Sequence, residues 1–218
     1  MRLENTTHQG KNWRVDTLAD DFELLDVWEY QIRGPRDGFG TFIDIVQRSH
    51  DGAWTSKGAV GALFRLRAFL GAVLGWDKGV NQIPIPGCQE SSLRERLSPE
   101  EKASQEWAQG NEEPTSDFRI VYRDEREFIA EISNGTIHAI MQHVWVPTDD
   151  GQAVPRMAVY VKHRGAFSRM YMSLINPFRY YFVYPWLLRR MERAWDRRGG
   201  ALLNLGACAA DNGPPFMR

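Results

Sequence analysis

The feature that most constrains this chain is an Asn-Gly pair between two runs of alternating apolar and polar residues. Asn134-Gly135 separates residues 127–133 from residues 136–146. Both residues tolerate the positive φ of a type I′ turn, which joins neighbouring antiparallel strands through a two-residue loop. The sequence therefore predicts an antiparallel hairpin in which Glu131 lies opposite His138.

The side chains of this hairpin divide into two faces, because successive residues of a strand point to opposite sides. One face is apolar apart from a single histidine, and we expect it to be the core or ligand face; the other face is mixed. The apolar face carries Phe128, Ala130, Ile132, Ile137, Ala139, Met141, His143 and Trp145. The mixed face carries Glu127, Ile129, Glu131, His138, Ile140 and Gln142.

The rest of the chain supplies further strands and helices in a definite order. β-favouring residues predict strands, and apolar residues at helical spacing predict helices. Strands are expected at residues 24–33, 118–124 and 156–162, and helices at 37–48, 55–76 and 166–198, the last broken or kinked at Pro177 and Pro185. One strand, two helices, an antiparallel sheet and a long C-terminal helix predict an α+β fold with the helices on one face of the sheet.

The 218 residues predict a single domain over residues 13–198. The polar start, residues 1–12, and the tail, residues 199–218, are expected to be disordered. Residues 78–117 contain four prolines and a run of glutamates, which predicts an irregular surface insertion or a lid.

Composition excludes several classes of protein. A formal net charge of −1 gives no general argument for nucleic-acid binding. Two cysteines make neither a disulfide framework nor a zinc site, and no uninterrupted apolar stretch is long enough to span a membrane. No metal site is expected because His138 and His143 lie on opposite faces of one strand. No cofactor motif is present, and the expected location is the cytoplasm.

Two groups on the hairpin are candidates for acid–base chemistry. His143 is either a general acid/base, a polar anchor for a ligand, or a hydrogen-bonded core histidine. Glu131 and His138 are either a histidine with its orienting carboxylate, or a solvated cross-strand pair. No serine or cysteine nucleophile can be placed beside them, so the sequence specifies no reaction.

The C-terminal segment is basic and aromatic. Residues 156–198 carry ten lysines and arginines against only Glu192 and Asp196, and they include a cluster of tyrosine, phenylalanine and tryptophan. One interpretation is contact with an anionic membrane surface. The alternative is a core helix whose arginines are solvated.

Several short motifs together resemble the bacterial domain-of-unknown-function family 2867 (DUF2867). They are Glu131-Ile-x-Asn134-x-Thr136-x-His138, Trp145-Val146, Asn176-Pro-Phe-Arg179 and Tyr184-Pro-x-Leu187, with Leu74-Gly-Trp-Asp77 and Ser92-Leu-Arg94 fitting the same pattern. The resemblance covers roughly residues 13–195. Relatives often carry a second histidine where this chain has Gln142.

The resemblance implies a fold but no defined activity. Members look related to the START/Bet v 1-like (SRPBCC) superfamily, in which a curved antiparallel sheet grips a long C-terminal helix around an apolar cavity. This implies a helix-grip fold and a small hydrophobic ligand, lipid-like or polyketide-like, bound by Phe128, Met141, His143 and Trp145. A cyclase-type or hydratase-type cavity enzyme is the main alternative, and a peripheral membrane protein is another. Some relatives follow a nucleotide-binding reductase domain, which implies a reductase partner.

Overall fold

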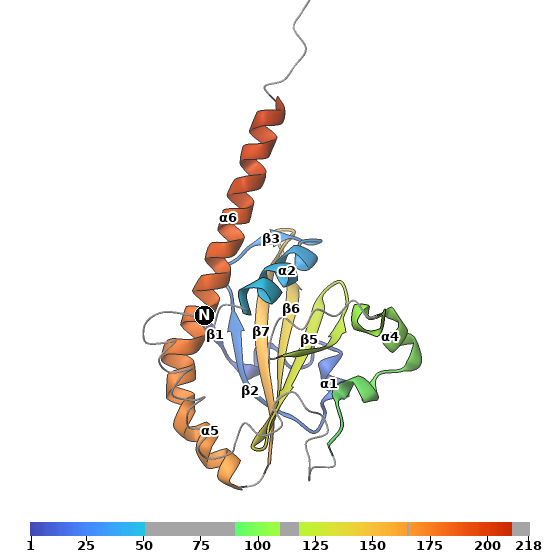
Figure 1. Cartoon of the computed structure of the whole chain (residues 1–218). Coiled ribbons are helices and arrows are strands. Elements are labelled where there is room, and N and C mark those ends of the chain that lie inside the picture. The colour runs from blue at the N-terminus through green and yellow to red at the C-terminus, as the bar shows by residue number, and fades with distance from the viewer. Residues whose placement is uncertain (51–89, 110–117, 165, 211–218) are drawn as a thin grey trace, which may run out of the picture.

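The structure is a computed structural model that describes residues 1–50, 90–109, 118–164 and 166–210. The predicted helix at residues 55–76 lies outside the described residues. The remaining elements form an α+β fold in which helices and short turns lie on a curved antiparallel sheet (Figure 1).

Over the described residues, the sheet has seven strands, all paired antiparallel. Its order is β1-β2-β7-β6-β5-β4, with β3 pairing to β7. The strands are β1 (Arg2–Leu3), β2 (Glu23–Glu29), β3 (Gly34–Pro35), β4 (Arg119–Arg123), β5 (Glu127–Ser133), β6 (Ile137–Pro147) and β7 (Gln152–His163). The five longer strands match the five predicted ones within a few residues. The sequence analysis missed β1 and β3, because a two-residue strand carries no alternation to detect.

The helices vary greatly in length. Short ones are η1 (Asn5–Thr7), α1 (Val15–Leu18), η2 (Leu93–Arg96), α4 (Pro99–Ser104) and η3 (Glu106–Gln109). Longer ones are α2 (Phe39–His50), α5 (Ala166–Phe178) and α6 (Tyr184–Ala210), the last two joined through a single π-helical stretch, η4 (Arg179–Val183). Pro177 lies inside α5 and Pro185 in the first turn of α6, where a missing N–H is tolerated.

The β5–β6 hairpin forms as predicted, but its register differs by two residues. Ser133 pairs with His138, so Glu131 lies opposite Ile140 rather than His138. The chain turns through Gly135 and Thr136, and the Asn134 side-chain oxygen accepts hydrogen bonds from the backbone N–H groups of Thr136 and Ile137, at 2.9 and 3.1 Å. The prediction of a type I′ turn was wrong, because such a turn needs positive φ at both central residues. Among the described residues, positive φ occurs at Asn12, Gly10 and Gly151, and not at Asn134 or Gly135. A shift by two leaves every side chain on its predicted face.

The predicted apolar face is packed by the later helices. Its core combines sheet residues with side chains from α2, α5, η4 and α6 (Figure 1). Buried members are Trp28, Tyr30, Phe39, Phe42, Ile43, Val46, Phe128, Ala130, Ala139, Trp145, Met157, Met172, Tyr184, Leu187, Leu188 and Met191. We call this the helix face of the sheet.

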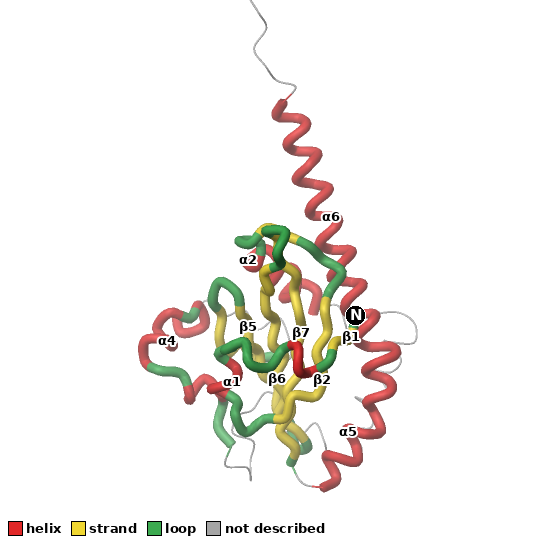
Figure 2. The backbone as a smooth tube through the Cα atoms, turned by 180° about the vertical axis from the view of Figure 1, so that it is seen from behind, coloured by secondary structure: helices red, strands yellow, loops and turns green. Residues whose placement is uncertain are grey.

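The opposite face is also buried. There Val27, Ile129, Ile140, Val144 and Ala158 pack against residues from the N-terminal segment and from η2. Figure 2 shows this side, where the chain from β1 through α1 crosses in front of the strands. We call it the strap face. This face of mixed composition is therefore a second buried layer, which short segments rather than long helices cover.

Three segments that the sequence analysis placed outside the regular part of the domain contain helices or strands among the described residues. Residues 1–12 are ordered by the β1–β2 pairing and by His8, which is buried. The described part of the predicted insertion or lid, residues 90–109, is held against the sheet, since Leu93 is fully buried and Trp107 donates a hydrogen bond to the Val121 carbonyl. The predicted tail is helical as far as Ala210, as a continuation of α6.

Gly34 gives a test of how tightly the helix face packs. A Cβ on Gly34 would lie 2.9 Å from ring atoms of both Trp145 and Trp195. We expect Gly34→Ala to lower the free energy of unfolding by about 1–3 kcal/mol, because neither ring can withdraw without disturbing the core. Chemical denaturation followed by circular dichroism measures the change.

Gly40→Ala is the matched control. Gly40 lies in α2, and the nearest atom to its added Cβ is 3.8 Å away. The same methyl group should there be neutral or stabilise by up to about 1 kcal/mol through helix propensity. Equal effects at the two positions would contradict the close packing at Gly34.

Candidate functional site

The helix face carries one buried hydrogen bond in an aromatic setting. His143 comes from the middle of β6, and Tyr30 follows directly after β2. His143 Nε2 and the Tyr30 hydroxyl lie 3.0 Å apart, and both residues are buried. The rings of Phe42 and Phe128 flank His143, with centroids at 5.9 and 6.2 Å. Burial raises the pKa of Tyr30 far above its usual value, so this hydroxyl keeps its proton near neutral pH.

The other residues predicted to line a ligand site lie around this pair. Phe128 is directly opposite His143 in the register, and Met141 precedes His143 on the same face. Phe128 and Trp145 are buried, whereas Met141 is only partly buried. Trp145 donates a hydrogen bond of 3.1 Å to the Pro35 carbonyl. The structure thus brings all four predicted residues onto one face; the cavity between them stays a prediction.

Apolar side chains on the β4–β6 side of this face are incompletely covered. Two alanines, Ala130 and Ala139, form the floor of this region, and larger apolar residues stand around them. The larger residues are partly buried: Phe118, Ile120, Ile132, Ile137 and Met141. In the strand register these small residues lie among the larger ones, on the same face of the sheet as the His143–Tyr30 pair. We call these five side chains and two alanines the apolar floor.

Glu131 and His138 are joined, but in a different environment from the one predicted. His138 Nε2 donates to Glu131 Oε2 at 2.9 Å, diagonally across β5 and β6. Both side chains are fully buried on the strap face, so the solvated-pair interpretation was wrong. Glu131 also accepts hydrogen bonds from the Ser92 hydroxyl and, at 3.0 Å, from the backbone N–H of Leu93.

The protonation of Glu131 follows from these contacts. Burial by itself would raise the pKa of the Glu131 carboxyl, but hydrogen bonds from His138, Ser92 and Leu93 outweigh it and the pKa is lowered. The carboxylate is thus ionised and its oxygens are occupied by protein donors. This arrangement fastens η2 to the sheet; within the described residues it leaves Glu131 no exposed surface for a substrate.

A second buried polar chain on the strap face was missed by sequence reasoning. His8 Nε2 donates to the Gln142 side-chain oxygen at 2.8 Å, and Gln142 Nε2 donates to Glu127 Oε1 at 2.8 Å. Glu127 accepts further bonds from the backbone N–H groups of Arg14 and Val15. Burial lowers the pKa of His8 and raises that of Glu127. The only available signal was that Glu127 and Gln142 share the predicted mixed face.

An ion pair between the sheet and the C-terminal helices was also missed. The Arg179 guanidinium lies 3.1 Å from Asp26 Oδ2, and Asp26 is fully buried on β2. Arg179 also donates to Asn176 Oδ1 at 2.7 Å and to the Tyr184 hydroxyl at 2.9 Å. Asp26 accepts from the Trp28 indole at 3.0 Å. A detectable signal existed, since Asp26 alternates with Trp28 and Tyr30 along the strand predicted at residues 24–33.

Comparisons with known proteins identify a family and nothing closer. Residues 18–186 match the family described as Protein of unknown function (DUF2867). The chain belongs to the DUF2867 family. No curated protein and no solved structure matches it.

The short motifs that carry the resemblance contain residues that connect different segments of the fold. Asn134 closes the β5–β6 turn, Glu131 and His138 hold η2, and Asn176 and Arg179 connect the C-terminal helices to Asp26.

Among the described residues, no helix is long and apolar enough to cross a membrane, and no group of three or more His, Cys, Asp or Glu is placed to hold a metal ion.

Glu131→Gln tests whether Glu131 is a structural anchor. At pH 7 we expect the free energy of unfolding to fall by about 1–3 kcal/mol. The glutamine side chain would replace one acceptor oxygen with an N–H group, so one of the donors that now bind the Glu131 carboxylate would lose its acceptor. A depressed folded-state pKa contributes stability that is present above the unfolded pKa, about 4.3, and is lost as pH falls through the folded value. The difference from wild type should therefore shrink below about pH 4.

Urea denaturation at a series of pH values measures this difference. The control is Glu95→Gln, which removes an exposed carboxylate from the same turn, η2, and should be nearly neutral. A Glu131→Gln penalty that does not change with pH would show that its charge is not what holds η2.

Proposed function

We propose that this DUF2867 protein binds a small apolar molecule over the apolar floor, with the His143–Tyr30 pair at the polar end of the ligand. The supporting observation is the half-buried ring of Ile120, Ile132, Ile137 and Met141 around two alanines, beside a buried polar pair. Ligand sites are mostly apolar with a few placed polar groups, which is the combination found here.

We also propose that the fold is of the helix-grip, START/Bet v 1-like type. In support, the first long strand, β2, lies beside the last, β7, and the intervening strands follow in chain order. The C-terminal helices α5 and α6 then return along this antiparallel sheet (Figure 1). In such an arrangement the space between the sheet and the C-terminal helix is where a ligand is held.

The polar end of the proposed site depends on the hydrogen bonds that the Tyr30 hydroxyl can make. A tyrosine hydroxyl is a donor and can also accept, so its bond to His143 leaves capacity for a ligand hydroxyl or carbonyl. Glu131 and His138 are not part of this site, because they lie on the strap face with Glu131 bonded to η2. An acid–base reaction at this site would therefore depend on His143.

Met141→Trp tests the position of the ligand. The indole would fill the space above Ala130 and Ala139, so the affinity for diphenylhexatriene, a hydrocarbon that fluoresces in apolar surroundings, should fall by about tenfold or more. Met141→Leu keeps the volume and should bind within about twofold of wild type. Fluorescence titration gives both constants; equal affinity in the Trp variant would place the dye elsewhere.

The double variant Tyr30→Phe, His143→Phe tests the polar end. Removing both partners of this hydrogen bond leaves neither the hydroxyl nor the imidazole alone, and phenylalanine rings keep the packing against Phe42 and Phe128, so the fold should be retained. Decanol, measured by displacement of diphenylhexatriene, should bind about threefold to tenfold more weakly, while the dye itself binds as before. Equal loss for alcohol and hydrocarbon would indicate a packing defect and remove the pair from the proposed site.

A further inference from the structure

The C-terminal helices present two opposite faces. Tyr184, Leu187, Leu188 and Met191 point into the helix-face core. The outward residues recur at spacings of three and four along the chain, which places them in one stripe. The stripe contains Phe178, Tyr181, Phe182, Pro185, Trp186, Arg189, Arg190 and Arg193, of which Trp186 is partly buried and also packs against the core. We call it the outer stripe.

The outer stripe exposes large aromatic side chains to solvent. Tyr181 is 77% exposed, Phe182 48% and Phe178 46%. Among the described residues, the only other large hydrophobic side chain this exposed is Met1. Its neighbour Arg2 lies over the ring of Tyr180, 4.3 Å from the centroid, so the N-terminus lies beside the same helices. Surface clusters of this kind mark interaction sites.

Arginines continue the stripe toward the end of the domain. A groove of about 450 Å³ is lined by Tyr181, Phe182, Pro185 and Trp186 together with Arg189, Arg190 and Arg193. Arg190 lies over the Trp186 ring at 5.4 Å. Residues 178–191 contain no Asp or Glu, and the Glu192 carboxylate accepts a hydrogen bond from the Gln31 backbone. The groove is therefore cationic as well as aromatic.

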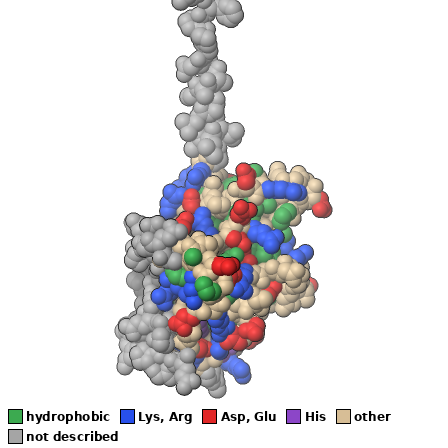
Figure 3. All heavy atoms as spheres, turned by 90° about the vertical axis from the view of Figure 1, so that its right-hand side faces the viewer, with side chains coloured by type: hydrophobic (Ala, Val, Ile, Leu, Met, Phe, Trp, Pro, Cys, Tyr) green, Lys and Arg blue, Asp and Glu red, His purple; other side chains and the backbone are tan. Residues whose placement is uncertain are grey.

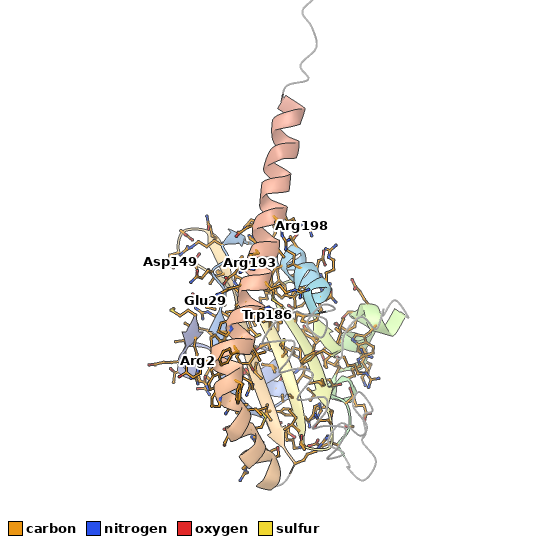
Figure 4. All side chains as sticks on the ribbon, turned by 60° about the vertical axis from the view of Figure 1, so that its left-hand side comes forward. Arg2, Glu29, Asp149, Trp186, Arg193 and Arg198 are labelled. Atoms are coloured by element: carbon orange, nitrogen blue, oxygen red, sulfur yellow. The ribbon has the colours of Figure 1, made fainter. Side chains whose placement is uncertain are left out.

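The charge distribution elsewhere is different. The surface seen in Figure 3, over α4 and the neighbouring strands, carries acidic and basic side chains side by side. Figure 4 shows Trp186, Arg193 and Arg198 along α6 and Arg2 of β1 beside them, with Glu29 of β2 and Asp149 of the β6–β7 loop nearby. Glu29 is engaged by Arg156 at 2.9 Å. The stripe therefore combines three arginines with exposed aromatic rings.

We propose that the outer stripe is a docking surface for an anionic phospholipid membrane. Tyrosine, tryptophan and phenylalanine side chains favour the boundary between headgroups and acyl chains, and arginines bind lipid phosphates. A folded protein partner would need a complementary apolar surface, whereas a bilayer supplies apolar depth and negative charge over the whole length of the stripe. The contact lies outside the ligand site proposed above and does not depend on it.

Vesicle co-sedimentation of the full chain tests the proposal. Binding is expected to vesicles of phosphatidylcholine with phosphatidylglycerol, to weaken with salt, and to be much weaker with phosphatidylcholine alone. The triple variant Arg189→Gln, Arg190→Gln, Arg193→Gln should bind on the order of 100-fold more weakly. Tyr181→Ser with Phe182→Ser should lose about tenfold, through loss of buried apolar area.

The matched control removes three exposed cations elsewhere, Lys11→Gln, Arg48→Gln and Arg126→Gln, and should lose at most a few-fold. Diphenylhexatriene binding should be unchanged in all these variants, which separates this surface from the ligand site. Three outcomes would overturn the proposal: no vesicle binding by wild type, equal loss in the control, or self-association that the stripe variants abolish in the absence of lipid.

Discussion

Burial of both faces of strand β6 is the constraint on which the rest of this structure depends. β6 lies between β5 and β7, and its side chains enter the helix face on one side and the strap face on the other. A strand in this position normally carries apolar residues only, yet β6 carries His138, Gln142 and His143, all buried. A buried polar group without a partner costs on the order of 1–3 kcal/mol, so each must find one.

Each of these polar residues connects β6, directly or through one partner, with a segment that has little structure of its own. Through Glu131, His138 is linked to Ser92 and η2. Gln142 binds His8 and, through Glu127, the start of α1. His143 binds Tyr30 in the connection after β2. The bonds explain why short pieces such as η1 and α1, too short to be stable alone, lie in fixed places over the sheet.

The sequence was sufficient for those features that depend on local alternation. The alternation along residues 127–146 assigned each side chain to the correct face of the sheet, because an error of two residues in the register does not move side chains from one face to the other. The register itself was wrong because the Asn134 side chain, rather than a positive φ, closes the turn. The N-terminal segment was judged disordered because its own composition is polar. Its order comes from His8 and Asn5, whose partners are remote in sequence.

The same limit explains the missed ion pair between Asp26 and Arg179. Each residue stands out in its own segment, a carboxylate among aromatic strand residues and an arginine in a motif, but 153 residues separate them. Only the fold shows that they meet. Their meeting point is where α5 passes through η4 into α6, and so it fixes the direction in which α6 leaves the sheet. Hence one buried pair orients both surfaces of that helix: the inner one that covers the helix face and the outer stripe with its arginines.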